Sequence, residues 1–187
     1  MPRFEIRIAG MGGQGIIMAG VMIGRAASIF GGKNVTLTQS YGPESRGGAC
    51  KAEVIVSDEP IDYPKVRQAN LVAVMSQEAY RKNISDSNSG AIVVIDPDMV
   101  QEDPSSHITR IFHVPASSIA ERLGKRIAAN MVMVGAIVAL TEMVEIEAVE
   151  KAITRYTPRG TEKLNLEAFR SGYEFARKLL QERMVTA

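Results

Sequence analysis

Apolar and polar residues alternate at the start of the chain. The apolar positions within residues 3–9 are Phe4, Ile6 and Ile8, and the polar positions between them are Arg3, Glu5 and Arg7. A period of two predicts a β-strand with one apolar and one polar face. Because a fully buried central strand would not tolerate a charged face, we expect this strand to be partly exposed or to lie near a partner.

Apolar runs along the rest of the chain alternate between strand-like and helix-like segments. The predicted strands cover residues 34–39, 49–57, 69–75, 91–95 and 110–114. The predicted helices cover about 14–30, a short segment after a Ser76 cap, 126–140, 146–156, and a stretch from an Asn165 cap to about Arg183. This alternation indicates an α/β fold, a three-layer α/β/α Rossmann-like domain with a mainly parallel sheet. At this length we expect one domain, 1–187.

Two of the predicted helices, 14–30 and 126–140, are apolar almost all the way round. The chain also contains 10 methionines. We expect this to be more apolar surface than one sheet covers, so that part of it is buried against a partner subunit.

A glycine-rich turn, Gly10-Met11-Gly12-Gly13-Gln14-Gly15, joins the first predicted strand to the first predicted helix. Its spacing matches the G-x-G-x-x-G pattern of dinucleotide-binding proteins. Glycine lets the backbone approach a ligand closely, and the N–H groups of a helix start attract a phosphate. The acidic residue that would bind a ribose hydroxyl is missing from the end of strand 34–39, which weakens the case for NAD. Close packing of the helix on the sheet is the alternative use of these glycines.

A second distinctive stretch runs from Ser40 to Gly48, with Pro, Gly and Ser at a density that excludes a regular element. It leaves the sheet at the same edge as the glycine turn, where ligands of open α/β sheets bind. Arg46 offers a planar, always-charged group for phosphate, and Tyr41 suits stacking on a base or packing on a partner. An exposed connection between two strands is the alternative.

Composition narrows the classes of function. A net charge of +1 gives no reason to expect nucleic acid or an anionic membrane surface, and the apolar run 131–140 is about half a membrane span. The lone Cys50 cannot hold an iron–sulfur cluster, which normally takes four thiolates, and the two histidines lack metal-ligand spacing. We therefore expect a cytoplasmic protein with no metal site of its own.

Other polar residues give weaker signals. Asp96-Pro97-Asp98 follows a predicted strand, and this pair of carboxylates is better explained by turn chemistry than by catalysis. Asn130 lies in an apolar segment and should form a hydrogen bond. No group of residues predicts a nucleophile or an acid–base pair, so we assign no catalytic residue.

Taken together, the two loops resemble the gamma subunit of 2-oxoacid:ferredoxin oxidoreductases. The glycine turn with Ile16 and the stretch Ser40 to Gly48 carry the resemblance, in that order along the chain. The segments Ala129 to Ala136 and Lys163 to Ala176 also look like that family. The resemblance covers essentially the whole chain and is greatest to the separate-chain type that acts on 2-oxoglutarate, with pyruvate and ketoisovalerate relatives.

The resemblance implies a subunit of a larger enzyme that is not active alone. Such enzymes decarboxylate a 2-oxoacid on thiamine diphosphate, pass electrons through iron–sulfur clusters to ferredoxin, and form an acyl-CoA. Alpha and beta chains hold the thiamine diphosphate, and clusters lie in the beta or a ferredoxin-like delta chain. The gamma chain helps bind coenzyme A. This role is carried onto six residues here: Gly12, Gly13, Gln14, Gly15, Arg46 and Asn130.

Two other functions stay open on the sequence. The glycine turn alone would also suit a nucleotide-binding or NAD-dependent module. A purely structural subunit that braces the catalytic chains is equally compatible, because loops that bind coenzyme A and loops that dock a partner share the same composition.

Overall fold

Six strands form one mixed sheet in the order β2-β3-β1-β4-β5-β6. The computed structural model describes residues 3–42, 48–84, 87, 90–103 and 110–186. The strands are β1 (Phe4–Met11), β2 (Asn34–Tyr41), β3 (Ala49–Ser57), β4 (Leu71–Val74), β5 (Ile92–Ile95) and β6 (Ile111–His113). β1, β4, β5 and β6 pair in parallel, whereas β3 is antiparallel to both of its neighbours. Five strands therefore run in one direction, and their carboxyl ends meet at one edge.

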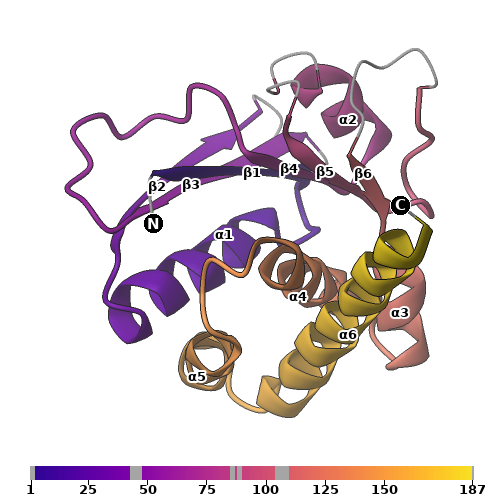
Figure 1. Cartoon of the computed structure of the whole chain (residues 1–187). Coiled ribbons are helices and arrows are strands. Elements are labelled where there is room, and N and C mark those ends of the chain that lie inside the picture. Colours follow the sequence, from indigo (N-terminus) through magenta and orange to yellow (C-terminus); the bar gives the residue numbers. More distant parts are fainter. Residues whose placement is uncertain (1–2, 43–47, 85–86, 88–89, 104–109, 187) are drawn as a thin grey trace.

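Helices cover both faces of this sheet unequally (Figure 1). The helices are α1 (Ile16–Arg25) with its π-helical continuation η1 (Ala26–Phe30), α2 (Gln77–Asn83), α3 (Ala116–Arg122), the 3₁₀ turn η2 (Arg126–Ala128), α4 (Ala129–Thr141), α5 (Ile146–Tyr156) and α6 (Glu162–Thr186). Among them only α2 lies on the upper face in this view, where it packs on Val72, Val74 and Val93. The predicted three-layer α/β/α, Rossmann-like fold is confirmed.

The direction of β3 follows from its short connection to β2. A few residues can join two strands only as an antiparallel pair, whereas a parallel pair needs a crossover helix. β3 thus lies between β1 and β2, with Cys50 opposite Gly10 on one side and opposite Tyr41 on the other. β2, the strand that follows α1 and η1, is therefore not hydrogen-bonded to β1.

Helix α4 is the centre of the larger core. All twelve residues from Ala129 to Leu140 are buried, and α6 packs along the helix. Gly135 and Gly172 allow this contact, because a Cβ on Gly135 would lie 2.7 Å from the Tyr173 nitrogen and collide with the Phe169 carbonyl. The apolar surplus that we expected a partner to bury is, for this helix, buried by the chain itself.

Of the two expectations for the first strand, partial exposure is wrong, and proximity to a partner stays a prediction. β1 is the third strand of six, and Glu5 and Arg7 are only 7% and 5% exposed. The Glu5 carboxylate accepts hydrogen bonds from the Arg67 amide at 2.7 Å and the Gln68 amide at 3.1 Å. Arg7 Nε donates to Glu53 Oε1 at 2.8 Å. Partners from distant segments therefore pair both buried charges, which lowers the cost of burying them, although Arg7 Nη1 is buried without a hydrogen-bond partner among the described residues.

Helix ends confirm one predicted cap and correct another. Ser76 Oγ accepts the Ala79 amide of α2 at 3.2 Å, as expected. Asn165 does not begin the last helix: α6 starts at Glu162, and Asn165 Nδ2 donates back to the Thr161 carbonyl at 2.9 Å. Helix α3, which the sequence did not predict, follows β6 directly.

Candidate functional site

The glycine turn leaves β1 at the carboxyl edge of the sheet and leads into α1. Gly13 and Gly15 have φ angles of 95° and 74°, in the left-handed region that favours glycine. A Cβ on Gly13 would meet no atom within 4 Å, so this residue faces open space. The turn therefore combines an open backbone with a helix start, as the sequence predicted.

Gln14 fixes the shape of the turn with both ends of its amide. Its Oε1 accepts the Met11 amide at 2.7 Å, and its Nε2 donates to the Met75 carbonyl at 2.6 Å. The absence of a side chain at Gly10 leaves room for it, since a Cβ there would collide with Gln14 Oε1. The Gln14 side chain thus ties the turn to the end of β4 and holds the neighbouring backbone in place.

Asn130 fixes the other end of the turn. It lies in the first turn of α4, is 6% exposed, and donates from Nδ2 to the Gly15 carbonyl at 3.2 Å. Its Oδ1 accepts the Met131 amide at 2.9 Å. The hydrogen bond expected from the sequence is present, and it places Asn130 behind the turn as a positioning residue.

The second predicted loop adjoins the first. The Gly12 amide donates to the Gly48 carbonyl at 2.9 Å, which brings the end of that loop against the glycine turn. Tyr41, at its start, is 66% exposed. Arg46 lies outside the described residues, so its predicted phosphate contact stays a prediction.

Some amides of the turn are already occupied and others are not. Besides Gly12, the Gln14 amide donates to the Met11 carbonyl at 3.2 Å, and the Ile17 amide donates to the buried Cys50 sulfur. Within the described ranges, neither the Gly13 amide nor the Gly15 amide donates a hydrogen bond. These two N–H groups remain for an external acceptor such as a phosphate oxygen.

A pocket of about 240 Å³ opens beside the turn at the carboxyl edge. Its walls come from the turn, the end of β4 and the starts of α3, η2 and α4, and the residues that line it are Gly13, Gln14, Met75, Ser117, Arg126, Ile127 and Ala129. It lies where the chain order reverses, since β2 follows on one side of β1 and β4 on the other. Open α/β sheets bind ligands at such switch points.

Asp96 lies behind this pocket and has a structural role. It is fully buried, its Oδ2 accepts the Ser117 amide at 2.9 Å and hydroxyl at 2.7 Å, and its Oδ1 accepts the Asp98 amide at 3.1 Å. Burial raises the pKa of the Asp96 carboxyl, and the hydrogen bonds from Ser117 partly oppose this rise. The Asp96-Pro97-Asp98 turn therefore orders the start of α3, which agrees with turn chemistry.

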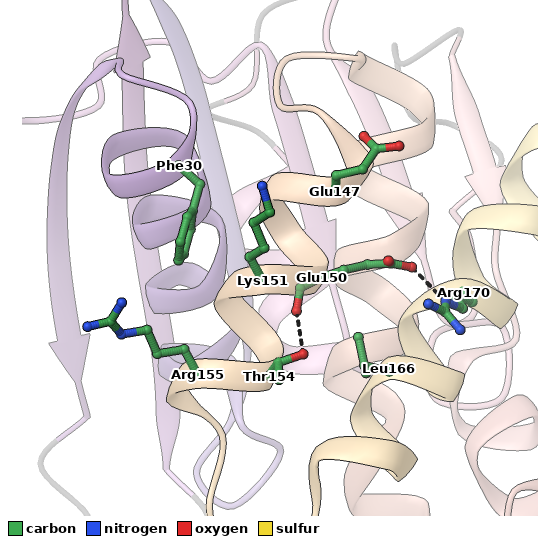
Figure 2. Close-up of a pocket in the computed structure, with 8 residues that line it drawn as sticks. All are labelled: Phe30, Glu147, Glu150, Lys151, Thr154, Arg155, Leu166 and Arg170. Carbon is green, nitrogen blue, oxygen red and sulfur yellow. Dashed lines mark hydrogen bonds and ion pairs between the residues drawn. The ribbon is translucent and has the colours of Figure 1, made fainter.

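A second hollow, of about 520 Å³, lies between η1, α5 and α6 (Figure 2). Its charged side chains are partly paired, with Arg170 Nε donating to Glu150 Oε1 at 2.6 Å. Phe30 in its wall ends the helical stretch that begins at Ile16, so the hollow lies roughly 20 Å from the glycine turn at 1.5 Å per residue. It is remote from the carboxyl edge, and we do not assign the site to it.

The sequence analysis did not name five of the lining residues as site residues: Met75, Ser117, Arg126, Ile127 and Ala129. Of these, Arg126 had a local signal, since it is a cation directly before an apolar helix. Within the described ranges there is no cluster of three His, Cys, Asp or Glu side chains that could hold a metal ion. None of the described helices is long and apolar enough to cross a membrane.

The fold and the site define a Rossmann-like α/β domain with a glycine turn at a switch point. A family model for pyruvate ferredoxin/flavodoxin oxidoreductase matches residues 5–175, and the chain belongs to this family. It is 49% identical to the 2-oxoglutarate synthase subunit KorC of Methanocaldococcus jannaschii, over 95% of this chain and 96% of that one. The predicted family resemblance is thereby confirmed.

Solved structures share this fold with high TM-scores. The gamma subunit of a keto/oxoacid ferredoxin oxidoreductase from Geobacter sulfurreducens is 41% identical, with a TM-score of 0.85 over 94% of this chain and 97% of that chain. The 2-oxoglutarate:ferredoxin oxidoreductase of Magnetococcus marinus, solved with 2-oxoglutarate, coenzyme A and succinyl-CoA, has a TM-score of 0.84 at 24% identity. This chain matches 32% of that longer one, so there the fold is one part of a larger polypeptide.

Proposed function

We propose that this chain is the gamma subunit of a thiamine-diphosphate-dependent 2-oxoglutarate:ferredoxin oxidoreductase and that it helps bind coenzyme A. The choice of 2-oxoglutarate is supported by the 49% identity to a 2-oxoglutarate synthase subunit across nearly both whole chains. The role in binding coenzyme A is supported by the glycine turn, since Gly13 lines the pocket and has open space around its Cβ position. We also propose that residues 1–187 act as one domain.

In this proposal the chain is not active alone. Thiamine diphosphate supplies the decarboxylation chemistry in the alpha and beta chains, and iron–sulfur clusters in the beta or delta chain carry electrons to ferredoxin. The single cysteine of the sequence agrees with this division, because a cluster normally takes four thiolates. Reduction of a dye by the purified chain with 2-oxoglutarate would contradict it.

The geometry also bears on the NAD alternative. In a dinucleotide-binding site the acid at the end of the second strand reaches the ribose from the strand beside β1. Here β3 separates the two strands, so the end of β2 is two strand spacings, or about 10 Å, away from β1. The last residues of β2 are Gln39, Ser40 and Tyr41 and include no acid. This arrangement counts against NAD as the ligand.

A charge introduced at Gly13 tests the proposed function. Asn and Asp are the residues that best tolerate a positive φ, and they differ by one charge. In the assembled complex, Gly13→Asp should raise the KM for coenzyme A much more than Gly13→Asn does. Two like charges about 4 Å apart repel by roughly 1–4 kcal/mol, so the ratio of the two KM values should be at least about fivefold.

Gly32→Asp is the matched control for this charge. Gly32 also has a positive φ, 64°, and open space around its Cβ position, but it lies beyond the far end of α1. It should leave the KM for coenzyme A unchanged. Equal KM values for Gly13→Asp and Gly13→Asn would favour the purely structural subunit.

A further inference from the structure

Arg126 approaches the glycine turn from a distant part of the chain. It is the first residue of η2, directly before α4, and it lines the same pocket of about 240 Å³ as Gly13 and Gln14. The pocket therefore places a cation beside the glycine turn, and the Gly13 amide of this turn donates no hydrogen bond within the described ranges. A guanidinium and an open amide side by side are suited to an anion with several oxygens.

The contacts of Arg126 leave its donors available. Its Nη2 lies 3.0 Å from the Met99 sulfur, which is a weak acceptor, and its Nη1 lies 3.5 Å from Glu121 Oε1. The side chains of Arg126 and Glu121 are 58% and 56% exposed, so solvent screens this ion pair. A phosphate would displace both contacts, because it forms short, charge-assisted hydrogen bonds with a guanidinium.

The rest of the pocket is mainly apolar. Met75, Ile127 and Ala129 contribute apolar atoms, and Ile127 is 63% exposed at the rim. Ser117 presents a hydroxyl that donates to the buried Asp96. Arg126 is therefore the one cation among the described residues that line this pocket.

The size of the pocket limits what it holds. Sites that enclose a whole drug-sized ligand measure about 300–1,000 Å³, and this one measures about 240 Å³. It suits a phosphate with the groups next to it, and the remainder of coenzyme A would extend to other surfaces.

We propose that Arg126 binds a phosphate of coenzyme A in this pocket, next to the Gly13 amide. The proposal rests on the proposed function and adds a residue that determines affinity for this co-substrate. Coenzyme A carries two kinds of phosphate that have this chemistry, the diphosphate and the 3′-phosphate. Dephospho-coenzyme A, which lacks the 3′-phosphate, distinguishes between them.

The test uses steady-state kinetics of the assembled complex with Arg126→Ala, Arg126→Lys and the control Arg122→Ala. Arg122 is an exposed cation at the end of α3 that does not line the pocket. Arg126→Ala should raise the KM for coenzyme A about ten- to 150-fold, which corresponds to the loss of one charged hydrogen bond of roughly 1.5–3 kcal/mol. Arg126→Lys should recover part of this, because it keeps the charge but loses the planar fork.

Dephospho-coenzyme A shows which phosphate Arg126 binds. The KM for 2-oxoglutarate and the kcat show whether the substitution has a general structural effect. If Arg126 binds the diphosphate, the KM for dephospho-coenzyme A rises equally; if it binds the 3′-phosphate, that KM is the same in wild type and variant. The KM for 2-oxoglutarate and the kcat at saturating coenzyme A should not change. A change in these two values, or an unchanged KM for coenzyme A, overturns the proposal.

The Gly13 variants separate this outcome from failure of the proposed function. If Gly13→Asp raises the KM for coenzyme A and Arg126→Ala does not, the glycine turn binds the co-substrate without Arg126. If neither variant affects that KM, the chain does not bind coenzyme A at this site, and both proposals fall.

Discussion

Asn130 and Gly15 are 115 positions apart in the sequence, and a hydrogen bond of 3.2 Å joins the Asn130 side chain to the Gly15 carbonyl. The contact links the first turn of α4 to the start of α1. It also explains why a glycine is needed at position 15, since a Cβ there would lie 2.9 Å from Asn130 Cγ and collide with its amide nitrogen. The two residues therefore form one unit that sets the position of the glycine turn.

This unit predicts coupling between the two positions. Gly15→Ala should destabilise the chain, because the left-handed conformation costs a non-glycine residue roughly 1–2 kcal/mol and the collision adds to it. Asn130→Ala in the same chain removes the collision and leaves only the conformational cost. Denaturant unfolding of wild type, both single variants and the double variant should give a double variant more stable than additivity predicts. Strict additivity would mean that the two residues do not act as a unit.

At Gly135 in α4, we expect a substitution of glycine by alanine to lower the stability of the chain. Within a helix this exchange normally stabilises by up to about 1 kcal/mol. At Gly135 the added methyl would push α4 away from the Phe169 carbonyl in α6, so we expect a loss of roughly 1–3 kcal/mol or more. Gly24→Ala in α1 is the control, since its Cβ would lie 3.5 Å from Val35 in ordinary contact. Thermal unfolding should lower the Tm of the first variant and not of the second.

Asp96 predicts a pH dependence opposite to that of most carboxylates. Because burial raises its pKa in the folded state, the folded chain binds more protons than the unfolded one between the ordinary value of 3.8 and the raised value. The contribution of Asp96 to the free energy of unfolding therefore falls as the pH rises through this window. Asp96→Asn removes the titration. The unfolding free energy of wild type minus that of the variant should decrease as the pH rises above about 4. An increase of this difference over the same range would contradict the assignment.

Arg46 keeps the prediction made from the sequence alone. If it binds a phosphate of coenzyme A, Arg46→Ala in the assembled complex should raise the requirement for coenzyme A about ten- to 150-fold. Decarboxylation of the oxoacid before coenzyme A reacts should proceed nearly unchanged. Rapid mixing with and without coenzyme A separates the two steps. Equal damage to the first step would assign Arg46 to docking of a partner subunit.

Glu142, the residue that follows α4, has a φ of 50°, and among the described residues other than glycine only Glu142 has a positive φ. Its carboxylate pairs with Arg177 at 2.6 Å, but both side chains are well exposed, so the pair contributes little. Glu142→Gly should raise the free energy of unfolding by a few tenths to about 1 kcal/mol by relieving the backbone. Arg177→Ala, the control, should change it by less than about 0.5 kcal/mol. Urea unfolding midpoints measure both.

Much of the fold was predictable from the sequence because its signals are local. The strand 49–57 and the helix 146–156 were predicted with the boundaries that the structure shows, since each has a clear period of its own. Ser76 was predicted as a cap because a cap depends on the next three residues. The glycine turn and the missing acid of the second strand could likewise be identified within short windows.

Other features depend on segments that are far apart in the sequence. The charges of Glu5 suggested an exposed strand until the amides of Arg67 and Gln68 were found to pair with it. The covering of α4 by α6 likewise follows from two glycines more than thirty positions apart, Gly135 and Gly172. The pattern of apolar and polar residues within one segment does not show which distant segment packs against it.

The candidate site is divided in the same way. The sequence by itself determined that a turn with an open backbone joins β1 to α1, because glycine spacing sets the local φ angles. Only the tertiary structure decided that Gln14 and Asn130 hold this turn from behind and that Arg126 lies beside it. The physical reason is that backbone conformation depends on neighbouring residues, whereas a pocket depends on how whole helices and strands pack against one another.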